Sequence, residues 1–432
     1  MTTRHRGPRR VFVEGFLALG NAIRPASETT NTSRRDTASA VSASPHRLKK
    51  THRLEHRPPF DSVALLLQGG GALGAYQAGA YEALAEADLH PDWVAGISIG
   101  AINSAIIAGN PREARVAKLR EFWELVSQSP FGLDGNLASL LPKGDAARAL
   151  AQHMSASTAS MLGVPGFYTM RFPSPLFQPP GTIEATSFCD TTPLKATLER
   201  LVDFDLINSE NYNTRLSLGS VNARSGQLVY FDTTTDVIRA EHVIASGALP
   251  PGFPAIEIDG EYYWDGGVVS NTPLAWIARQ HPPSMLAFQV DLWAAPGPFP
   301  KNLQEVMIRM KEILNSSRTI YHTSGYKEIN HVRATLARFL EQVPDEFKRS
   351  EDAKFLMSVA KQHLHHLINL VYRPTSPEDA SKENEFSRKS VEDRWLAGYR
   401  DTVHALRHPE VLERAAGCDA GIFVFDFGKD GG

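Results

Sequence analysis

Short apolar runs alternate with helix-forming stretches in the middle of the chain. Val63 to Leu67 form a continuous apolar run, which is typical of a strand buried on both faces, and WVAGI at 93–97 is the next apolar run. MLAFQVDL at 285–292 indicates another buried strand. The stretch from Ala75 to Ala87 is rich in Ala, Leu and Glu, which favours helix. The runs at 215–223 and 227–232 predict a hairpin. This alternation predicts an α/β fold, with a mainly parallel central sheet flanked by helices.

The pattern changes beyond about residue 300. Residues 302–343 and 350–371 carry apolar side chains at helical spacing together with many charges. We expect amphipathic helices that cover the sheet, with a membrane or partner face as the alternative. The interpretation is therefore an α/β domain over 61–295 and a mainly helical C-terminal extension over 296–432.

The first 60 residues have a different composition. They hold 12 Lys or Arg and four Asp or Glu, a net charge of +8, and few large apolar side chains from 26 to 44. Such a segment cannot supply a core, so we expect a disordered basic tail. VFVEGFLALGNAI at 11–23 follows several arginines, and it leaves membrane-surface contact and cleavable targeting open. No run of 18 apolar residues exists, which disfavours a transmembrane helix.

A glycine-rich loop, QGGGALG, follows the first apolar run. Gly69, Gly71 and Gly74 satisfy the G-x-G-x-x-G pattern, and backbone N–H groups at a helix start attract negative charge of any kind. A nucleotide site needs an acidic residue after the second strand. Asp92 lies before that strand, so the sequence does not favour a nucleotide.

The second apolar run ends in GISIG at 96–100, which matches the G-x-S-x-G pattern of an exposed serine on a sharp strand-to-helix turn. Gly96 and Gly100 leave room for the turn, and Ser98 is the candidate nucleophile. The carboxyl ends of two successive parallel strands lie on one edge of a sheet. The N–H groups of the glycine loop can therefore point toward a carbonyl attacked by Ser98.

A serine nucleophile needs a base, and YYWDGGVVSNTPL at 262–274 offers one. Asp265 follows an aromatic run, and Gly266 and Gly267 allow a sharp turn behind it. An ordinary turn between strands is the alternative. Burial of Asp265 beside aromatic residues is expected to raise its pKa toward a value useful for a base.

In this order, GGGALG, GISIG and DGG resemble the patatin-like phospholipases, as does ASGALPPGFP at 245–254. The resemblance spans roughly residues 62–290. It implies a three-layer sandwich, Ser98 as nucleophile, Asp265 as sole general base, and a lipid ester as substrate, cleaved by phospholipase A or lysophospholipase chemistry without metal or organic cofactor. The oxyanion hole would be formed by the backbone of Gly69, Gly70, Gly71, Ala72 and Gly74. Leu73 stands where many such proteins have Arg or Lys.

Two other functions stay open from the sequence. An α/β-hydrolase would use a Ser-His-Asp triad, but its oxyanion motif lies further from the nucleophile in sequence. The histidines after Asp265, including His363, His365 and His366, are interpreted as solvated or helical-surface residues, and His242 as a packing or capping residue. The third hypothesis is a non-catalytic lipid-binding protein.

The charge and the cysteine content bear on the partners of the protein and on its location. The chain has a net charge of −3, so the part beyond residue 60 carries −11, which disfavours a nucleic-acid partner. Two cysteines, Cys189 and Cys418, are too few for a disulfide framework. We expect a protein of the cytoplasm or the periphery of a membrane surface. The Pro-rich and Gly-rich patch at 163–181 predicts a surface insertion, with a lid or acyl channel as the alternative.

Overall fold

The computed structural model describes residues 48–128, 145–210, 212–280, 282–360, 363–374, 382–414 and 421–427. The expected N-terminal tail lies outside these residues as far as residue 47, and Cys418 lies outside them as well.

Within the described residues, nine strands form one sheet in the order β12-β11-β10-β1-β2-β6-β9-β8, with β7 also paired to β6. The pairs from β12 to β6 are parallel, and β6 pairs antiparallel with both β7 and β9. The strands are β1 (Ser62–Leu67), β2 (Trp93–Gly96), β6 (Arg215–Asn222), β7 (Leu228–Asp232), β8 (Ile256–Ile258), β9 (Glu261–Asp265), β10 (Met285–Asp291), β11 (Leu364–Val371) and β12 (Gly421–Asp426).

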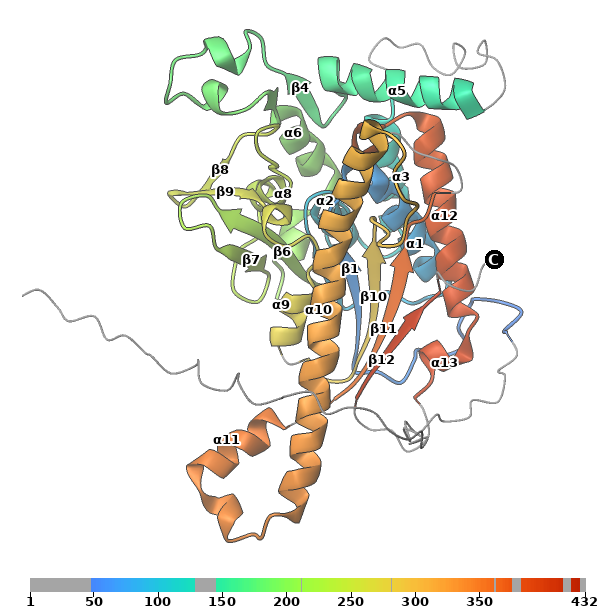
Figure 1. Cartoon of the computed structure of the whole chain (residues 1–432), viewed down its shortest axis with the longest axis vertical. Coiled ribbons are helices and arrows are strands. Elements are labelled where there is room, and N and C mark those ends of the chain that lie inside the picture. The colour runs from blue at the N-terminus through green and yellow to red at the C-terminus, as the bar shows by residue number, and fades with distance from the viewer. Residues whose placement is uncertain are drawn as a thin grey trace, which may run out of the picture. The chain divides into compact units, whose positions relative to one another are not determined.

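Helices cover both faces of this sheet, because β1 and β10 are apolar on both sides. Leu65, Leu67 and Phe288 pack on the face that carries α1, α2 and α3, while Leu66 packs with Leu274 on the face that carries α9 and α10. Figure 1 shows α10 running along the sheet and α12 beside α1. The helices are α1 (Ala75–Glu86), α2 (Ile99–Ala108), α3 (Arg115–Val126), α5 (Asp145–Leu162), α6 (Thr192–Leu201), α7 (Phe204–Ile207), α8 (Ala240–Ser246), α9 (Leu274–Arg279), α10 (Leu303–Gln342), α11 (Glu351–Val359), α12 (Arg388–Leu406) and α13 (Pro409–Leu412).

Short elements complete the description. A small antiparallel sheet precedes α6, and single 3-10 turns lie in several loops. These elements are β3 (Gly163–Val164), β4 (Tyr168–Met170), β5 (Cys189–Asp190), η1 (Gly71–Gly74), η2 (Pro175–Phe177), η3 (Ile183–Thr186), η4 (Gly266–Val268), η5 (Phe347–Arg349) and η6 (Lys382–Asn384).

The predicted strands and hairpin are confirmed, and so is the α/β architecture with a helical C-terminal region. The expectation of helix over 350–371 is wrong for its second half. Residues 364–371 form β11, which lies between β10 and β12 in the sheet. His365 and His366 are buried in this strand, so their assignment to a helical surface is also wrong. An apolar run that is covered on both faces favours a strand.

The C-terminal region therefore adds β11 and β12 to the sheet that begins with β1. Its helix α12 packs along α1, where the backbones approach closely. None of the helices among the described residues combines the length and the apolar character needed to cross a bilayer.

Candidate active site

Ser98 occupies the turn between β2 and α2. Its backbone has φ 58° and ψ −127°, and a positive φ is strained for any residue with a side chain. Ile97 and Ile99 on either side are buried, whereas Ser98 is partly exposed. Gly96 ends β2 and Gly100 lies in the first turn of α2, both buried. The strained turn thus presents one hydroxyl at the edge of the sheet.

The end of α8 and the residues after it hold this turn in place. The Ser98 N–H donates to the carbonyl oxygen of Ser246 at 3.0 Å and to its Oγ at 3.2 Å. The Ser246 hydroxyl donates in turn to the Gly219 carbonyl on β6, at 2.6 Å. Two residues further on, Ala248 accepts the N–H of Asp265 at 3.0 Å. One short segment therefore positions the backbones of both candidate catalytic residues.

Asp265 is the last residue of β9, opposite Ser220 on β6, and its side chain is buried. The N–H of Gly267, in η4 behind Gly266, donates to its Oδ1 at 2.7 Å. Burial raises the pKa of the Asp265 carboxyl to about 6, and hydrogen bonding from Ser98 and Gly267 opposes that rise. The expected increase is confirmed in direction. At neutral pH the group is a carboxylate facing the Ser98 hydroxyl.

The glycine loop begins directly after β1. Gly69 is buried, and its N–H donates to the Asn271 carbonyl at 3.3 Å. Gly70 and Gly71 are partly exposed at the start of η1, where N–H groups have no acceptor within the turn. Among the described residues, no hydrogen-bond acceptor of the protein contacts either N–H. Of the five predicted oxyanion residues, these two are partly exposed, whereas Gly69, Ala72 and Gly74 are buried.

Two side chains that the sequence analysis missed converge on this loop. Asn271 Nδ2 donates to the Gly69 carbonyl at 2.9 Å, and Trp293 Nε1 donates to the same oxygen at 3.0 Å. A Cβ placed on Gly69 would lie 2.4 Å from Asn271 Oδ1 and 3.0 Å from Ser98 Cβ, so all of these groups lie close together. Trp293 lies two residues after the end of β10. Its position at the carboxyl end of a predicted strand was the one feature of the sequence that could have indicated its place near the site.

Two family models match the chain. Residues 65–277 match the model described as "Patatin-like phospholipase", and residues 313–417 match one described as "Patatin phospholipase". The chain belongs to the patatin-like phospholipase family. The first match contains the glycine loop, Ser98 and Asp265, and the second contains β11 and α12.

Known relatives are similar to parts of this patatin-like chain. "Lysophospholipase nte1" of Aspergillus terreus is 49% identical over 57 residues, which cover 13% of this chain and 4% of that relative. The crystal structure of VipD from Legionella pneumophila has a TM-score of 0.34 and 14% identity, with 85% of this chain and 72% of that chain covered. The type III effector ExoU of Pseudomonas aeruginosa has a TM-score of 0.32 and 16% identity, with 83% and 55% covered. The family assignment rests on the two sequence models.

The patatin-like site does not contain the parts of a histidine triad among its described residues. Among the described residues, the hydrogen bonds to the Asp265 carboxyl come from Ser98 and Gly267, and none comes from a histidine. His365 lies opposite Met285, at the amino end of β10 and away from the edge that carries Ser98. His242 accepts the Arg239 N–H at 2.9 Å, which confirms its capping role.

Leu73 occupies the position where a basic residue was expected from the family pattern. Its side chain is fully buried in the core, so it contributes no charge to the loop. Among the described residues, no group of three or more His, Cys, Asp or Glu side chains could hold a metal ion.

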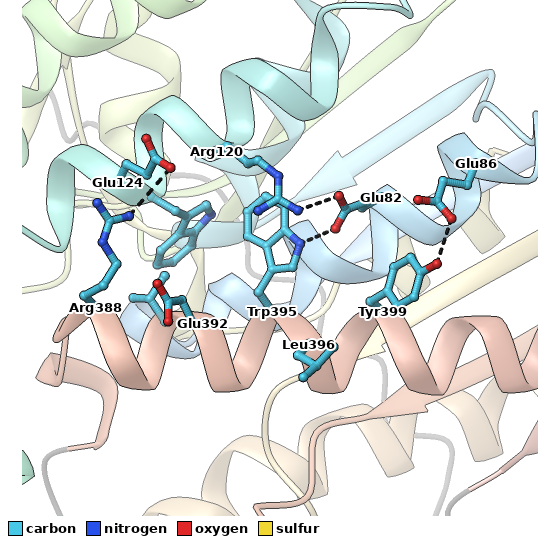
Figure 2. Close-up of a pocket in the computed structure, with 11 residues that line it drawn as sticks. Glu82, Glu86, Arg120, Glu124, Arg388, Glu392, Trp395, Leu396 and Tyr399 are labelled. Atoms are coloured by element: carbon cyan, nitrogen blue, oxygen red, sulfur yellow. Dashed lines mark hydrogen bonds and ion pairs between the residues drawn. The ribbon is translucent and has the colours of Figure 1, made fainter.

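A cavity of about 370 Å³ lies between α1, α3 and α12, away from the candidate catalytic residues. Figure 2 shows Glu82, Arg120 and Trp395 interacting across it. Arg120 covers the Trp395 ring at 4.6 Å, so the aromatic face there is already occupied by a cation of the protein. Among the described residues, none of those that line this cavity contacts Ser98 or Asp265. The cavity is therefore not part of the site.

Proposed function

We propose that this chain is a serine hydrolase of lipid acyl esters, of the phospholipase A or lysophospholipase type, that works through a Ser98–Asp265 dyad. The observation that carries the proposal is the arrangement of three features at one edge of the sheet. A strained, partly exposed Ser98 faces a buried Asp265 with a pKa of about 6, beside two N–H groups that have no acceptor in the part of the chain that the structure describes. This arrangement supports acyl transfer through a covalent intermediate.

The proposed reaction has two steps. Ser98 Oγ attacks the ester carbonyl carbon and Asp265 takes the hydroxyl proton. The N–H groups of Gly70 and Gly71 stabilise the negative oxygen of the tetrahedral intermediate. As the C–O bond breaks, Asp265 gives the proton to the leaving alkoxide. A water molecule then attacks the acyl-enzyme, again with Asp265 as base, and releases the fatty acid and Ser98.

Apolar side chains near the dyad support a lipid substrate. Leu249, next to Ala248, is 50% exposed, and Val268 and Val269, next to Gly267, are 41% and 45% exposed. Exposed branched side chains beside a nucleophile favour contact with an acyl chain over a polar substrate. Transient contact with a membrane surface, from the cytoplasm, would bring such a substrate to the site.

The proposal predicts a specific pH dependence. Asp265 must be ionised to accept the Ser98 proton, and its pKa is about 6. The kcat/KM for a soluble ester should therefore fall about tenfold per pH unit below pH 6, and level off above pH 7. A profile that stays flat from about pH 4 to 8 would contradict the role of Asp265 as base.

The decisive test is fatty-acid release from p-nitrophenyl esters, lysophospholipids, phospholipids and glycerides. The wild type would be compared with Ser98→Ala and Asp265→Asn, each checked for folding by circular dichroism. Loss of release in both variants supports the dyad, and the preferred substrate identifies the lipid class. Activity that survives Asp265→Asn would favour a histidine triad. A wild type that cleaves none of the esters would favour the lipid-binding function.

A further inference from the structure

The Gly69 carbonyl is held by two buried side-chain donors. Asn271 and Trp293 are only 4% and 5% exposed, and both donate to this oxygen. A carbonyl oxygen has two lone pairs, and here each has a directed partner. The peptide between Gly69 and Gly70 is therefore fixed in orientation from its oxygen side.

The peptide unit transmits this constraint to the next residue. Because a trans peptide is planar, its C=O and N–H point in opposite directions. Fixing the Gly69 carbonyl thus fixes the direction of the Gly70 N–H, which has no acceptor among the described residues. Gly69 lies against Ser98, with only 3.0 Å between an added Cβ and Ser98 Cβ.

We propose that Trp293 and Asn271 are positioning residues that aim the Gly70 N–H at the oxyanion formed on Ser98. This inference rests on the proposed function. Neither side chain touches the reacting atoms in this role; each acts through the Gly69–Gly70 peptide. An oxyanion-hole donor accelerates the reaction only if it already points at the developing charge, so its orientation matters as much as its presence.

The C-terminal region holds Trp293 in place. The Lys382 ammonium lies 5.3 Å from the centroid of the Trp293 ring, and it pairs with Glu312 at 2.9 Å. The Lys382 side chain is 7% exposed and that of Glu312 is 19% exposed, so this cation–π contact is largely shielded from water. The side chain of Asn315, on α10, accepts from Asn271 Nδ2 at 3.3 Å. Both positioning residues therefore contact groups supplied from beyond residue 300.

This arrangement gives the loop a support that its own sequence lacks. Leu73 brings no charge to the loop, and the first family match ends at residue 277, before Trp293. The loop is fixed instead by an indole N–H and an amide, backed by a buried cation. The second matched region contributes Lys382, and the backbone oxygen of Glu383 lies 2.3 Å from where a Cβ on Gly71 would be.

Trp293→Phe tests the inference, because it removes the N–H donor and keeps an aromatic ring under Lys382. The readouts are kcat and KM for a soluble ester, and inhibition constants for two lipid analogues. A trifluoromethyl ketone forms an oxyanion adduct with Ser98, whereas an ether analogue cannot. We expect kcat to fall about tenfold or more with KM changed less than about twofold. The ketone should bind weaker by a similar factor and the ether equally well.

Trp395→Phe is the matched control. Its indole N–H also donates to a side-chain oxygen, that of the partly buried Glu82, but in the remote cavity of Figure 2. Its kcat and ketone affinity should equal those of the wild type. If Trp293→Phe keeps wild-type kcat and ketone affinity, or weakens ketone and ether equally, the positioning role is wrong.

Asn271→Ala is a second test, and its outcome does not depend on whether Trp293→Phe folds. It should lower kcat and ketone affinity without weakening the ether, and an unchanged kcat would overturn the inference. Because both donors act on one carbonyl, the effects of Asn271→Ala and Trp293→Phe should be non-additive in the double variant. A wild type without Ser98-dependent esterase activity would instead refute the proposed function itself.

Discussion

Glycine allows close backbone contacts in two regions of this protein, and the two regions differ in whether their polar groups are paired. Where α1 crosses α12, a Cβ on Gly79 or Gly398 would lie 1.9 Å from a carbonyl of the other helix. The polar groups beside that crossing are paired, as between Tyr76 and Asp401 at 2.7 Å. At the sheet edge that carries Ser98, the glycine loop instead holds two N–H groups that no described acceptor contacts, near the buried carboxyl group of Asp265. The first region favours stability, and the second retains the unfavourable features that the proposed reaction would use.

The largest effect should come from Asp265→Asn. We expect kcat/KM to fall roughly 10²- to 10⁴-fold, because the proposed general base is lost. The free energy of unfolding should change in the other direction: at high pH, Asp265→Asn should be more stable than the wild type. The pKa of Asp265 is raised in the fold from 3.8 to about 6, so its favourable contribution is complete below about pH 4 and lost as pH rises through 6. Above pH 7 the ionised group costs on the order of 3 kcal/mol, which the amide removes.

Thermal melts of Asp265→Asn and wild type between pH 4 and 8 measure this. The stability difference in favour of the variant should grow from pH 4 to about 6 and then become constant. A lower melting temperature for the variant than for the wild type at pH 8 would mean that the ionised Asp265 does not destabilise the fold.

Gly71→Ala should lower activity nearly as far. Gly71 has φ 56°, and an added Cβ would meet the Glu383 carbonyl oxygen at 2.3 Å. The loop must shift to avoid this contact, which misdirects an oxyanion donor, so we expect kcat to fall about 10²-fold. Steady-state kinetics would measure this fall in kcat. If the variant unfolds and does not lose kcat, Gly71 serves stability, as Gly79 and Gly398 do at the helix crossing.

Gly398→Ala should have the complementary result. The added methyl group forces α12 away from the Tyr76 carbonyl, and overpacking of this kind costs roughly 1–3 kcal/mol or more. Urea unfolding should show the loss, while kcat per folded molecule stays at the wild-type value. A fall in kcat at full folding would mean that the crossing also controls the site.

The smallest expected effect is a difference in stability between two variants that lack the proposed nucleophile. Ser98→Gly removes the backbone strain at φ 58°, whereas Ser98→Ala keeps it. We expect the glycine variant to be the more stable of the two by about 1 kcal/mol in urea unfolding, after allowance for its freer unfolded chain. Equal stability would indicate that the turn stores little strain.

The sequence was informative where local pattern and chemistry agree. The continuous apolar run before Gly69 predicted β1, and GISIG predicted the turn at Ser98, because each depends mainly on neighbouring residues. The rise in the pKa of Asp265 followed from an aromatic run that a sheet would bury. Strand β11 was missed, because a short apolar run does not reveal whether both of its faces are covered.

The order of the motifs and the residue types at the site were thus set by the sequence itself. The tertiary structure alone decided which backbone N–H groups are free: the Gly69 N–H donates to Asn271, whereas those of Gly70 and Gly71 have no acceptor among the described residues. It also brought Trp293 and Lys382 to the loop from far along the chain. Such long-range contacts depend on how β10 and η6 pack against β1 and the glycine loop, and no local pattern encodes that packing.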